Sequence, residues 1–533
     1  MQARRGFVHG AMLLAGAAIV SKLLGSVYTI LLQNIIGDHG MGLFQMAYPV
    51  YATLLAIATA GFPVAISKIV SERIALGDVH GARQTFRMAM GLLTTGGIVC
   101  FGLLYGFAPV WARIAGDPGA EWAIRAIAPA LLLVPVMSTL RGYFQGYQWM
   151  EPTAYSQVLE QIVRVATILG LASWLTSRGY SQAVSAAGAA FGAVTGAAAG
   201  FLLLLYFWRK RHPHVDVQDG VRATTWQLAK QLLYVAFPIS LGALVVPLMN
   251  NVDVITVVNL LKAAGEPQHL ATTEFGLLSG RAAKLMMLPT TLAAGIGIAV
   301  MPAVSEAFTL GFRKLITERV DTSVRLTVLL ALPASFGLAV LAKPVDIALF
   351  KDTAGATSIQ VMAFATIFAS VQTTFAAILQ GAGWVYLPVI NLLAASGVKV
   401  LCNLWLVPLY GIDGAAAATV LSYATAAVLN FWAMKRCLGQ GLPWRRWVLR
   451  PAVATFIMTA AVFAMNEQWE RWGGLGSSRL SVALALLVML GVGMVVYLIA
   501  MLAADALTPK ELASIPKIGP RLVLWCGRLG LIR

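Results

Sequence analysis

The chain has 533 residues, of which 59% are hydrophobic and only 11% are charged, and its mean hydropathy is +0.78. So little polar surface cannot cover a water-soluble globule of this length, which excludes a soluble enzyme or binding domain. The formal net charge of +17 would suggest nucleic acid binding in a soluble protein. Here the basic residues gather in short loops, where they set membrane topology and contact anionic lipids, so we expect no nucleic acid partner.

Apolar segments long enough to cross a bilayer recur along the whole chain, since a hydrocarbon core of about 30 Å needs roughly 20 apolar residues in a helix. We interpret the first as a retained helix because it runs long, contains Lys22 and lacks a clear cleavage site. The predicted spans are 8–32, 43–70, 85–110, 122–146, 154–176, 181–208, 232–261, 275–304, 322–349, 359–381, 385–409, 412–434, 447–465 and 479–503. This pattern predicts an all-α polytopic membrane protein of about fourteen transmembrane helices.

The distribution of basic residues tests this count, because one missed or extra span would invert every later loop. By our assignment about 25 Lys and Arg lie on the side of the N-terminus, about 8 on the other side and about 6 within spans. Basic clusters on the first side include 209–211, Arg313 with Lys314, and Arg445 with Arg446. We therefore expect a multi-pass protein of the bacterial cytoplasmic membrane with both termini in the cytoplasm.

The chain also repeats itself at an offset of about 235 residues. Segment 61–72 aligns without gaps to 295–306, and the motif Gln-Gly-x-x-Trp occurs at 145–149 and again at 380–384. A repeat of six spans keeps its orientation, which predicts two lobes related by a pseudo-two-fold axis along the membrane normal. The predicted parts are an N-terminal six-helix lobe 1–208, a basic cytoplasmic linker 209–231, a C-terminal six-helix lobe 232–437, two further helices 438–505 and a basic amphipathic cytoplasmic tail 506–533.

Glycines recur at every fourth residue of the sixth predicted span, at Gly188, Gly192, Gly196 and Gly200. Residues four apart share one face of a helix, so this stripe should let a neighbouring helix approach closely. We interpret the stripe as a packing feature.

Nothing in the sequence indicates a metal cofactor. The cysteines are scattered singly, with no CxxC pair and no histidine beside them, and are expected to be inert. They are Cys100, Cys402, Cys437 and Cys526. His212 and His214 lie in a loop and are expected to be solvated.

Several basic residues fall within predicted spans, where each costs at least about 2.5 kcal/mol and should face a wet cavity or a partner. These candidate substrate-binding residues are Lys22, Arg141, Arg164, Arg281, Lys284 and Lys399. The spacing of Arg281 and Lys284 places both on one face of a helix. The alternatives are snorkelling, most applicable to Arg141, and ion pairing, as between Arg164 and Glu160 one turn earlier. Intramembrane acids are scarcer, so the cavity should be net positive and attract phosphate or pyrophosphate.

Three polar residues in the seventh span, Asn250, Asn251 and Asp253, are candidates for ion coupling. Their oxygens could bind a coupling cation, and the aspartate could carry a proton. A polar turn near the outer end of the helix explains them equally well. Na⁺, H⁺ and the membrane potential all stay open as driving forces.

Four motifs carry a resemblance to a known family. They are Lys22-Leu-Leu-Gly25, the segment from Gly42 to Tyr51, the segment from Gly61 to Lys68, and Lys284-Leu-Met-Met-Leu-Pro289. Together they resemble the multidrug/oligosaccharidyl-lipid/polysaccharide (MOP) exporter superfamily, over essentially all the spans. The branch that the chain resembles most is the stage V sporulation protein B-like polysaccharide exporters, which are related to the MurJ lipid II flippases. The resemblance implies two lobes around a central cavity, alternating access, and a groove for a polyprenyl tail at the final helix pair.

By this resemblance Lys22 and Lys284 match basic residues of the family that bind phosphate in the cavity. Two positions depart from the lipid II flippases. Tyr28 stands in place of a second arginine in the first helix, and the stretch 52–58 lacks the arginine of the second. Another undecaprenyl-pyrophosphate oligosaccharide therefore stays open as the substrate.

We predict a flippase for a lipid-linked cell-envelope saccharide used in peptidoglycan, polysaccharide or spore wall synthesis. Its partners would be membrane lipids, the undecaprenyl-pyrophosphate-linked saccharide and envelope-synthesis machinery. One alternative is a cation-coupled small-molecule exporter, which a basic cavity argues against. Another is a membrane-embedded polysaccharide enzyme, which would need convergent acids or a nucleophile. A non-transporting scaffold would leave the costly membrane cations unexplained.

Overall fold

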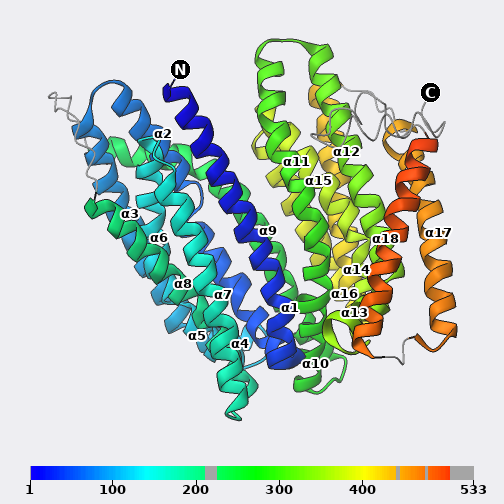
Figure 1. Cartoon of the computed structure of the whole chain (residues 1–533). Helices are drawn as coiled ribbons and strands as arrows, with labels where there is room; N and C mark the ends of the chain where they lie inside the picture. The colour runs from blue at the N-terminus through cyan, green and yellow to red at the C-terminus, as the bar shows by residue number, and fades with distance from the viewer. Residues whose placement is uncertain (1, 211–224, 440–444, 475–477, 505–533) are drawn as a thin grey trace. The chain divides into compact units, whose positions relative to one another are not determined.

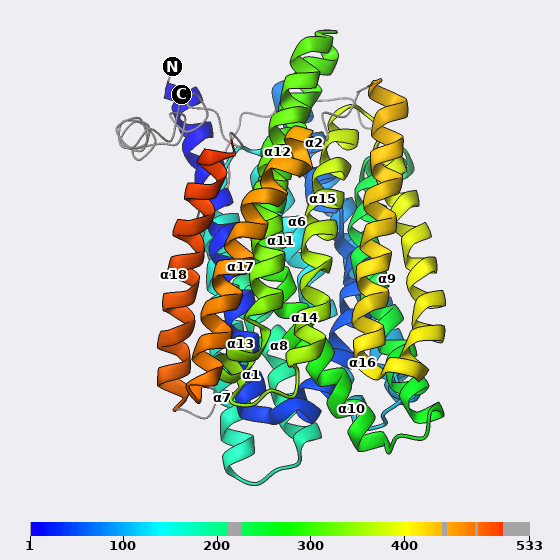
Figure 2. The ribbon, with the colours of Figure 1, turned by 90° about the vertical axis from the view of Figure 1, so that its right-hand side faces the viewer.

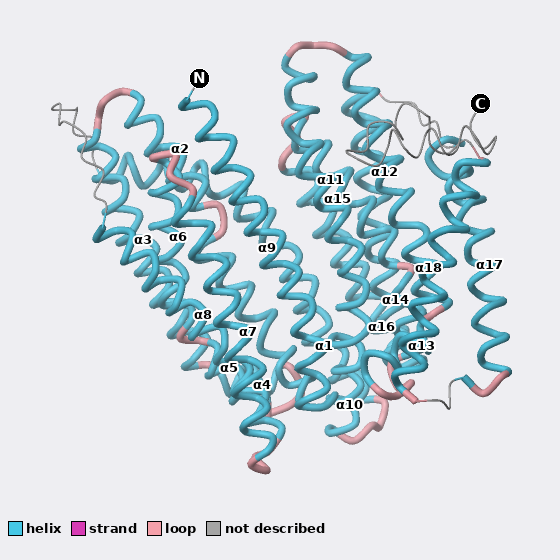
Figure 3. The backbone as a smooth tube through the Cα atoms, viewed as in Figure 1, coloured by secondary structure: helices cyan, strands magenta, loops and turns pink. Residues whose placement is uncertain are grey.

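The computed structural model describes residues 2–210, 225–439, 445–474 and 478–504. Within these ranges the secondary structure is helical and no strand occurs (Figure 3). Twelve helical segments of the described chain are long and apolar enough to cross a membrane. The prediction of an all-α multi-pass membrane protein is confirmed. Most of the predicted linker, at 211–224, and the whole predicted C-terminal tail 506–533 lie outside the described residues.

The chain folds into two compact units, 1–280 and 281–533. Unit 1 contains ten α-helices of the described chain, drawn blue to green in Figure 1. They are α1 Gln2–Thr59, α2 Phe62–Ala75, α3 Val79–Gly106, α4 Ala108–Ile114, α5 Ala120–Ile127, α6 Ala130–Gly146, α7 Glu151–Ser177, α8 Gln182–Lys210, α9 Thr225–Ala263 and α10 Gln268–Gly276. A π-helical segment, η1 Leu277–Ala282, contains the boundary between the units.

Unit 2 continues from η1 to the end of the chain and is seen most directly in Figure 2. Its helices are α11 Ala283–Thr309, α12 Arg313–Val340, α13 Ala342–Phe350, α14 Ala356–Ala363, α15 Ala365–Gly381, α16 Tyr386–Leu438, the π-helical η2 Arg445–Leu449, α17 Arg450–Arg471 and α18 Arg479–Ala503. The last two lie side by side as an antiparallel pair. The predicted span 322–349 is divided, because α12 ends at Val340 and α13 follows as a separate short helix.

Two long helices change direction at a glycine. In α1 the break is Gly37, with φ of 74° and ψ of 176°, and in α16 it is Gly411, with φ of 58° and ψ of −139°. A side chain disfavours both conformations, which glycine adopts readily. Dividing each helix at its glycine brings the twelve candidate spans of the described chain to the predicted fourteen.

The glycine stripe of α8 packs against α7, as predicted. A Cβ atom added at Gly192 would lie 2.4 Å from Ile168 Cγ1, and one added at Gly196 would lie 2.7 Å from both the Glu160 carbonyl oxygen and Arg164 Cβ. Only glycine lets the helices approach this closely. The stripe therefore sets the position of the turn of α7 that carries Glu160 and Arg164.

The internal repeat reappears as matching contacts. A Cβ added at Gly146 would lie 3.2 Å from the Ser67 carbonyl oxygen, and one added at Gly381 would lie 2.5 Å from that of Met301. The pair α6–α2 is thus packed like the pair α15–α11. The compact units nevertheless divide at 280 and not at the predicted linker 209–231, because α9 and α10 pack on α1. The predicted lobe boundaries and symmetry axis stay predictions.

Candidate functional site

Arg281 is paired within unit 2. Its side chain is 2% exposed, and its Nη1 donates to Asp346 Oδ1 at 2.9 Å and to Asp352 Oδ1 at 2.6 Å. Nη2 adds a bond to Asp352 Oδ2 at 3.1 Å, and the guanidinium lies 4.9 Å from the ring centroid of Phe350. Two carboxylates already neutralise this charge, so its surroundings give the predicted substrate-binding role no support.

Lys284, the second residue of α11, lies three residues later and has different surroundings. Its side chain is of intermediate exposure, and no acidic or hydrogen-bonding partner contacts its ammonium among the described residues. Arg281 lies in the π-helical segment η1 and Lys284 in the α-helix that follows it, and the predicted common face of the two residues stays a prediction. Lys284 is therefore the predicted cation of unit 2 whose charge is available for a ligand.

Lys399 and Lys22 are the remaining predicted cations, and each lies within a long helix. Lys399 lies within α16 at 2% exposure and takes part in an interaction within the chain. Lys22 lies within α1, but its side chain is outside the described part of the structure. The predicted ligand role of each stays a prediction.

Arg141, Glu160 and Arg164 form a three-residue ion-pair cluster in unit 1. Arg164 Nη2 donates to Glu160 Oε1 at 2.6 Å, which confirms the pairing considered from the sequence. Arg141, on α6, donates from Nη2 to the other oxygen of the same carboxylate at 2.9 Å, and from Nε to Ser156 Oγ at 3.1 Å. One carboxylate thus serves two guanidinium groups, so the cluster keeps a net charge of about +1.

The three candidate ion-coupling residues differ in their surroundings. Asn251, on α9, donates from Nδ2 to the Pro49 carbonyl at 3.2 Å and to Thr53 Oγ1 at 2.6 Å, both on α1. Asn250 is exposed, and Asp253 takes part in an interaction within the chain. The bonds of Asn251 join α9 to α1 beside Pro49, where proline breaks the helical hydrogen bonding. Cation coupling by these residues stays a prediction.

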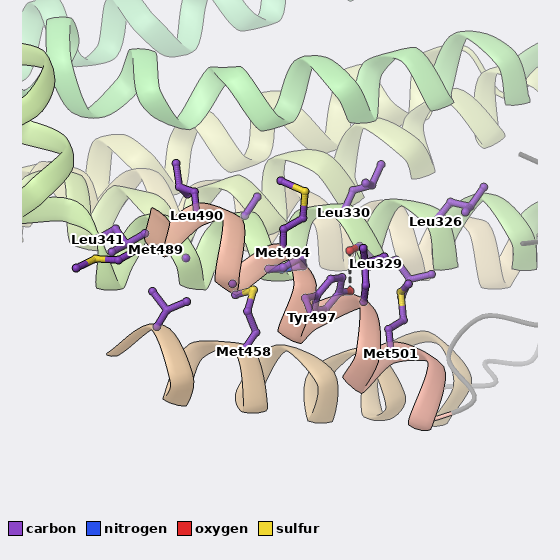
Figure 4. Close-up of a pocket in the computed structure, with 16 residues that line it drawn as sticks. Leu326, Leu329, Leu330, Leu341, Met458, Met489, Leu490, Met494, Tyr497 and Met501 are labelled. Atoms are coloured by element: carbon purple, nitrogen blue, oxygen red, sulfur yellow. Dashed lines mark hydrogen bonds between the residues drawn. The ribbon is translucent and has the colours of Figure 1, made fainter. Parts of the chain in front are cut away.

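An apolar groove of about 450 Å³ lies among α12, α17 and α18 (Figure 4). Leucines line most of its α12 side, and four methionines contribute from the other two helices, Met458, Met489, Met494 and Met501. The hydroxyl of Tyr497 donates to the Leu329 carbonyl at 2.8 Å, so this polar atom is already satisfied. Methionine is flexible and adapts to ligands of variable shape. The groove lies at the final helix pair, where the family resemblance implies one.

The partners that decide what each cation can do are far from it in the sequence. Asp346 and Asp352 lie 65 and 71 residues from Arg281, and Arg141 is 19 residues from Glu160 on another helix. No spacing rule joins residues so far apart. The short separation of Glu160 and Arg164 was the one usable signal for the unit 1 cluster.

Curated relatives cover nearly the whole chain. An uncharacterized membrane protein of Bacillus subtilis, YabM, is 34% identical over 95% of this chain and 94% of its own length. The lipid II flippase MurJ of the same organism is 30% identical over 87% of this chain and 88% of its own length. The stage V sporulation protein B of this bacterium is 28% identical over 98% of this chain and 100% of its own length.

Solved structures share the fold at 15% sequence identity. A lipid II flippase MurJ in an inward closed conformation matches with a TM-score of 0.62, over 92% of this chain and 98% of that one. An inward-facing multidrug resistance MATE family transporter of the MOP superfamily matches with a TM-score of 0.64, over 79% and 94%. Residues 7–308 match the polysaccharide biosynthesis protein family. With the relatives above, this match shows that the chain belongs to the polysaccharide biosynthesis protein family, and its similarity to the stage V sporulation protein B and, in fold, to a MOP superfamily transporter agrees with the predicted resemblance.

Proposed function

We propose that this protein is a flippase that moves an undecaprenyl-pyrophosphate-linked saccharide from the inner to the outer leaflet of a bacterial cytoplasmic membrane by alternating access. Relatives named as a lipid II flippase and as a stage V sporulation protein support this assignment. No covalent step is needed, because the substrate only changes leaflet. Both termini lie in the cytoplasm in this proposal, and the envelope-synthesis machinery supplies and consumes the substrate.

The observation that carries the proposal is the apolar groove of α12, α17 and α18. Its volume of about 450 Å³ is in the range of small-ligand sites, and its lining of leucine and methionine suits a hydrocarbon chain. Export of a small water-soluble molecule does not require such a groove. A substrate with a long isoprenoid tail can keep that tail in the groove while its polar headgroup crosses.

The headgroup requires a polar path that offers positive charge. Lys284 supports this requirement, since an ammonium kept in a membrane span without a described partner is costly. A pyrophosphate would give this ammonium charge-assisted hydrogen bonds in a low-dielectric setting. We therefore assign Lys284 to the headgroup path of the proposed flippase.

The proposal is tested by reconstituting the purified protein in liposomes with fluorescent undecaprenyl-pyrophosphate sugars and following headgroup accessibility under Na⁺, proton and potential gradients. Wild type should move the lipid, and Lys284→Ala should slow the movement at least about tenfold, since losing one charge-assisted contact costs well over 1 kcal/mol. Lys284→Arg should keep part of the rate. Lys314→Ala, which removes an exposed lysine near the start of α12, is the matched control and should behave like wild type.

The outcomes separate the two parts of the proposal. No movement by folded wild-type protein under any gradient would overturn the flippase function. Normal movement by Lys284→Ala would leave the flippase function standing and remove Lys284 from the headgroup path.

A further inference from the structure

We propose that Arg141, Arg164 and Tyr51 form an oxyanion-binding site in unit 1 and that Glu160 is its built-in counter-ion, which an anionic group of the substrate headgroup displaces. This inference rests on the proposed flippase function and assigns a subsite and an exchange step to it. The chemistry of the site selects a phosphate or pyrophosphate oxygen.

The geometry places one carboxylate where a phosphate would fit. Both oxygens of Glu160 are used, one by Arg164 at 2.6 Å and the other by Arg141 at 2.9 Å. The side chains are largely enclosed, with exposed fractions of 17% for Arg141, 19% for Arg164 and 13% for Glu160. Guanidinium groups recognise carboxylate and phosphate by the same planar hydrogen bonding, so the carboxylate occupies a place that suits a phosphate.

The charge balance favours exchange. Two guanidinium groups share a single carboxylate, so the cluster keeps about one positive charge in a membrane-spanning region, where an uncompensated cation is costly. A doubly charged phosphate would neutralise both cations more fully than Glu160 does. The substrate headgroup is therefore a better counter-ion than the one that the protein supplies.

Donors of the cluster remain unused, which points to a missing acceptor. The Nε of Arg164 and the hydroxyl of Tyr51 are both buried and have no hydrogen-bond partner in the described chain. Tyr51 is 2% exposed, and its side chain interacts electrostatically with that of Arg164. Buried polar groups without partners are rare in native structures and call for an explanation. A phosphate held between the two arginines would supply acceptor oxygens for these donors.

The aromatic surroundings suit a saccharide next to this charge. Tyr48 lies with its ring centroid 6.1 Å from that of Tyr51 and 6.3 Å from that of Phe44, and Tyr28 and Tyr48 also lie within electrostatic range of Arg164. Ligand sites commonly combine aromatic walls with a few placed polar groups. Tyr28 is also the position at which this chain departs from the lipid II flippase pattern.

Glu160 then acts in release of the headgroup as well as in the site without substrate. When the headgroup leaves, the carboxylate returns to the arginines and prevents the anion from rebinding. Because Glu160 and the anion compete for the same arginines, a change that weakens the pairing of Glu160 with the arginines strengthens anion binding, and a change that strengthens this pairing weakens anion binding. Removing the Glu160 charge should therefore tighten binding and slow turnover, which a purely structural ion pair would not do.

The test measures binding of inorganic pyrophosphate to purified full-length protein by calorimetry. Glu160→Gln should bind pyrophosphate at least about fivefold tighter than wild type, because its competitor is removed. The double variant Glu160→Gln with Arg164→Gln should lose the gain. Glu121→Gln is the matched control, since Glu121 also pairs with an arginine four residues later, Arg125, at 2.9 Å. The Glu121→Gln variant should bind pyrophosphate with the affinity of wild type.

Tyr51→Phe keeps the test decisive if Glu160→Gln does not fold. The Tyr51 hydroxyl bonds to nothing in the described protein, so its removal should leave thermal stability unchanged and weaken pyrophosphate binding several-fold. Unchanged affinity in both Tyr51→Phe and Glu160→Gln, or weaker binding by Glu160→Gln, would overturn the inference.

A competition arm identifies the source of the anion and separates this inference from the proposed function. Undecaprenyl pyrophosphate should displace inorganic pyrophosphate from wild type if the ligand is the lipid headgroup. Displacement by inorganic pyrophosphate and phosphate alone would reject the lipid source and with it the inference as stated. Lipid movement by wild type together with unaltered Glu160→Gln affinity would reject the inference alone, and pyrophosphate binding without lipid movement would reject the flippase function alone.

Discussion

Arg281 and Lys284 lie three residues apart and carry the same charge, yet their neighbours give them different parts to play. Two carboxylates surround the buried guanidinium of Arg281, and one of them, Asp346, also accepts the Gly355 N–H at 2.8 Å. This arrangement joins η1 to α13 and to the loop before α14. Lys284 has no comparable partner among the described residues. At the scale of a residue, its surroundings decide whether a membrane cation stabilises the fold or is left for a ligand.

We predict that Arg281→Met lowers the stability of the protein and that Lys284→Met does not. Removing the guanidinium leaves Asp346 buried without its cation, and breaking a buried pair costs about 3–5 kcal/mol. The measurement is the thermal midpoint of the purified variants in detergent. Equal midpoints for Arg281→Met and wild type would mean that the pair contributes little net stability.

At the scale of the element, close helix packing prepares the two candidate binding regions differently. The glycine stripe of α8 brings the backbone of α7 within reach and so fixes where Glu160 and Arg164 stand. The pair α17–α18 leaves a groove against α12. Small residues bring helices together in the first case, and leucine and methionine side chains line the remaining space in the second.

We predict that Gly337→Leu impairs movement of undecaprenyl-linked lipids and spares analogues with a short tail. Gly337 lines the groove, and a Cβ there would lie 3.8 Å from Met458 Cε, so a leucine fills the groove without a backbone clash. The measurement compares liposome transport rates for long and short isoprenoid tails. Gly491→Leu is the control, because it adds the same side chain to α18 where a Cβ meets nothing within 4 Å. An equal loss for both tail lengths would argue against a tail-binding groove.

At the scale of the whole molecule, the predicted orientation follows from charge alone. Basic residues are retained on the cytoplasmic side, and an even number of spans returns the chain to the side on which it starts. The fourteen spans, counted with the breaks at Gly37 and Gly411, meet this condition. With both termini in the cytoplasm, as proposed, the same count predicts that the turn between α7 and α8 lies outside and that the turn between α11 and α12 lies inside.

We predict that a cysteine at Ser181 reacts with an impermeant maleimide on intact cells and that one at Thr309 reacts only after permeabilisation. Both positions are exposed in the described structure and lie in or beside these turns. The background would lack the four native cysteines. Labelling of both cysteines on intact cells, or of Thr309→Cys alone, would contradict the proposed topology.

The sequence by itself determined the features that depend on neighbours along the chain. Hydropathy runs predicted the spans, a spacing of four predicted the face of α8 that packs closely, and the same spacing joined Glu160 to Arg164. These succeed because a helix converts sequence distance directly into position. Even here the predicted span 322–349 concealed the break at Leu341 between α12 and α13.

Only the tertiary structure decided which polar groups meet across helices and which space stays open. The second arginine on Glu160 comes from α6, the acids that neutralise Arg281 come from beyond α12, and the apolar groove needs three helices. The grouping of α9 and α10 with α1 likewise follows from packing and not from the repeat. Energies of burial and ion pairing depend on distance in space, and one sequence without its fold does not specify those distances.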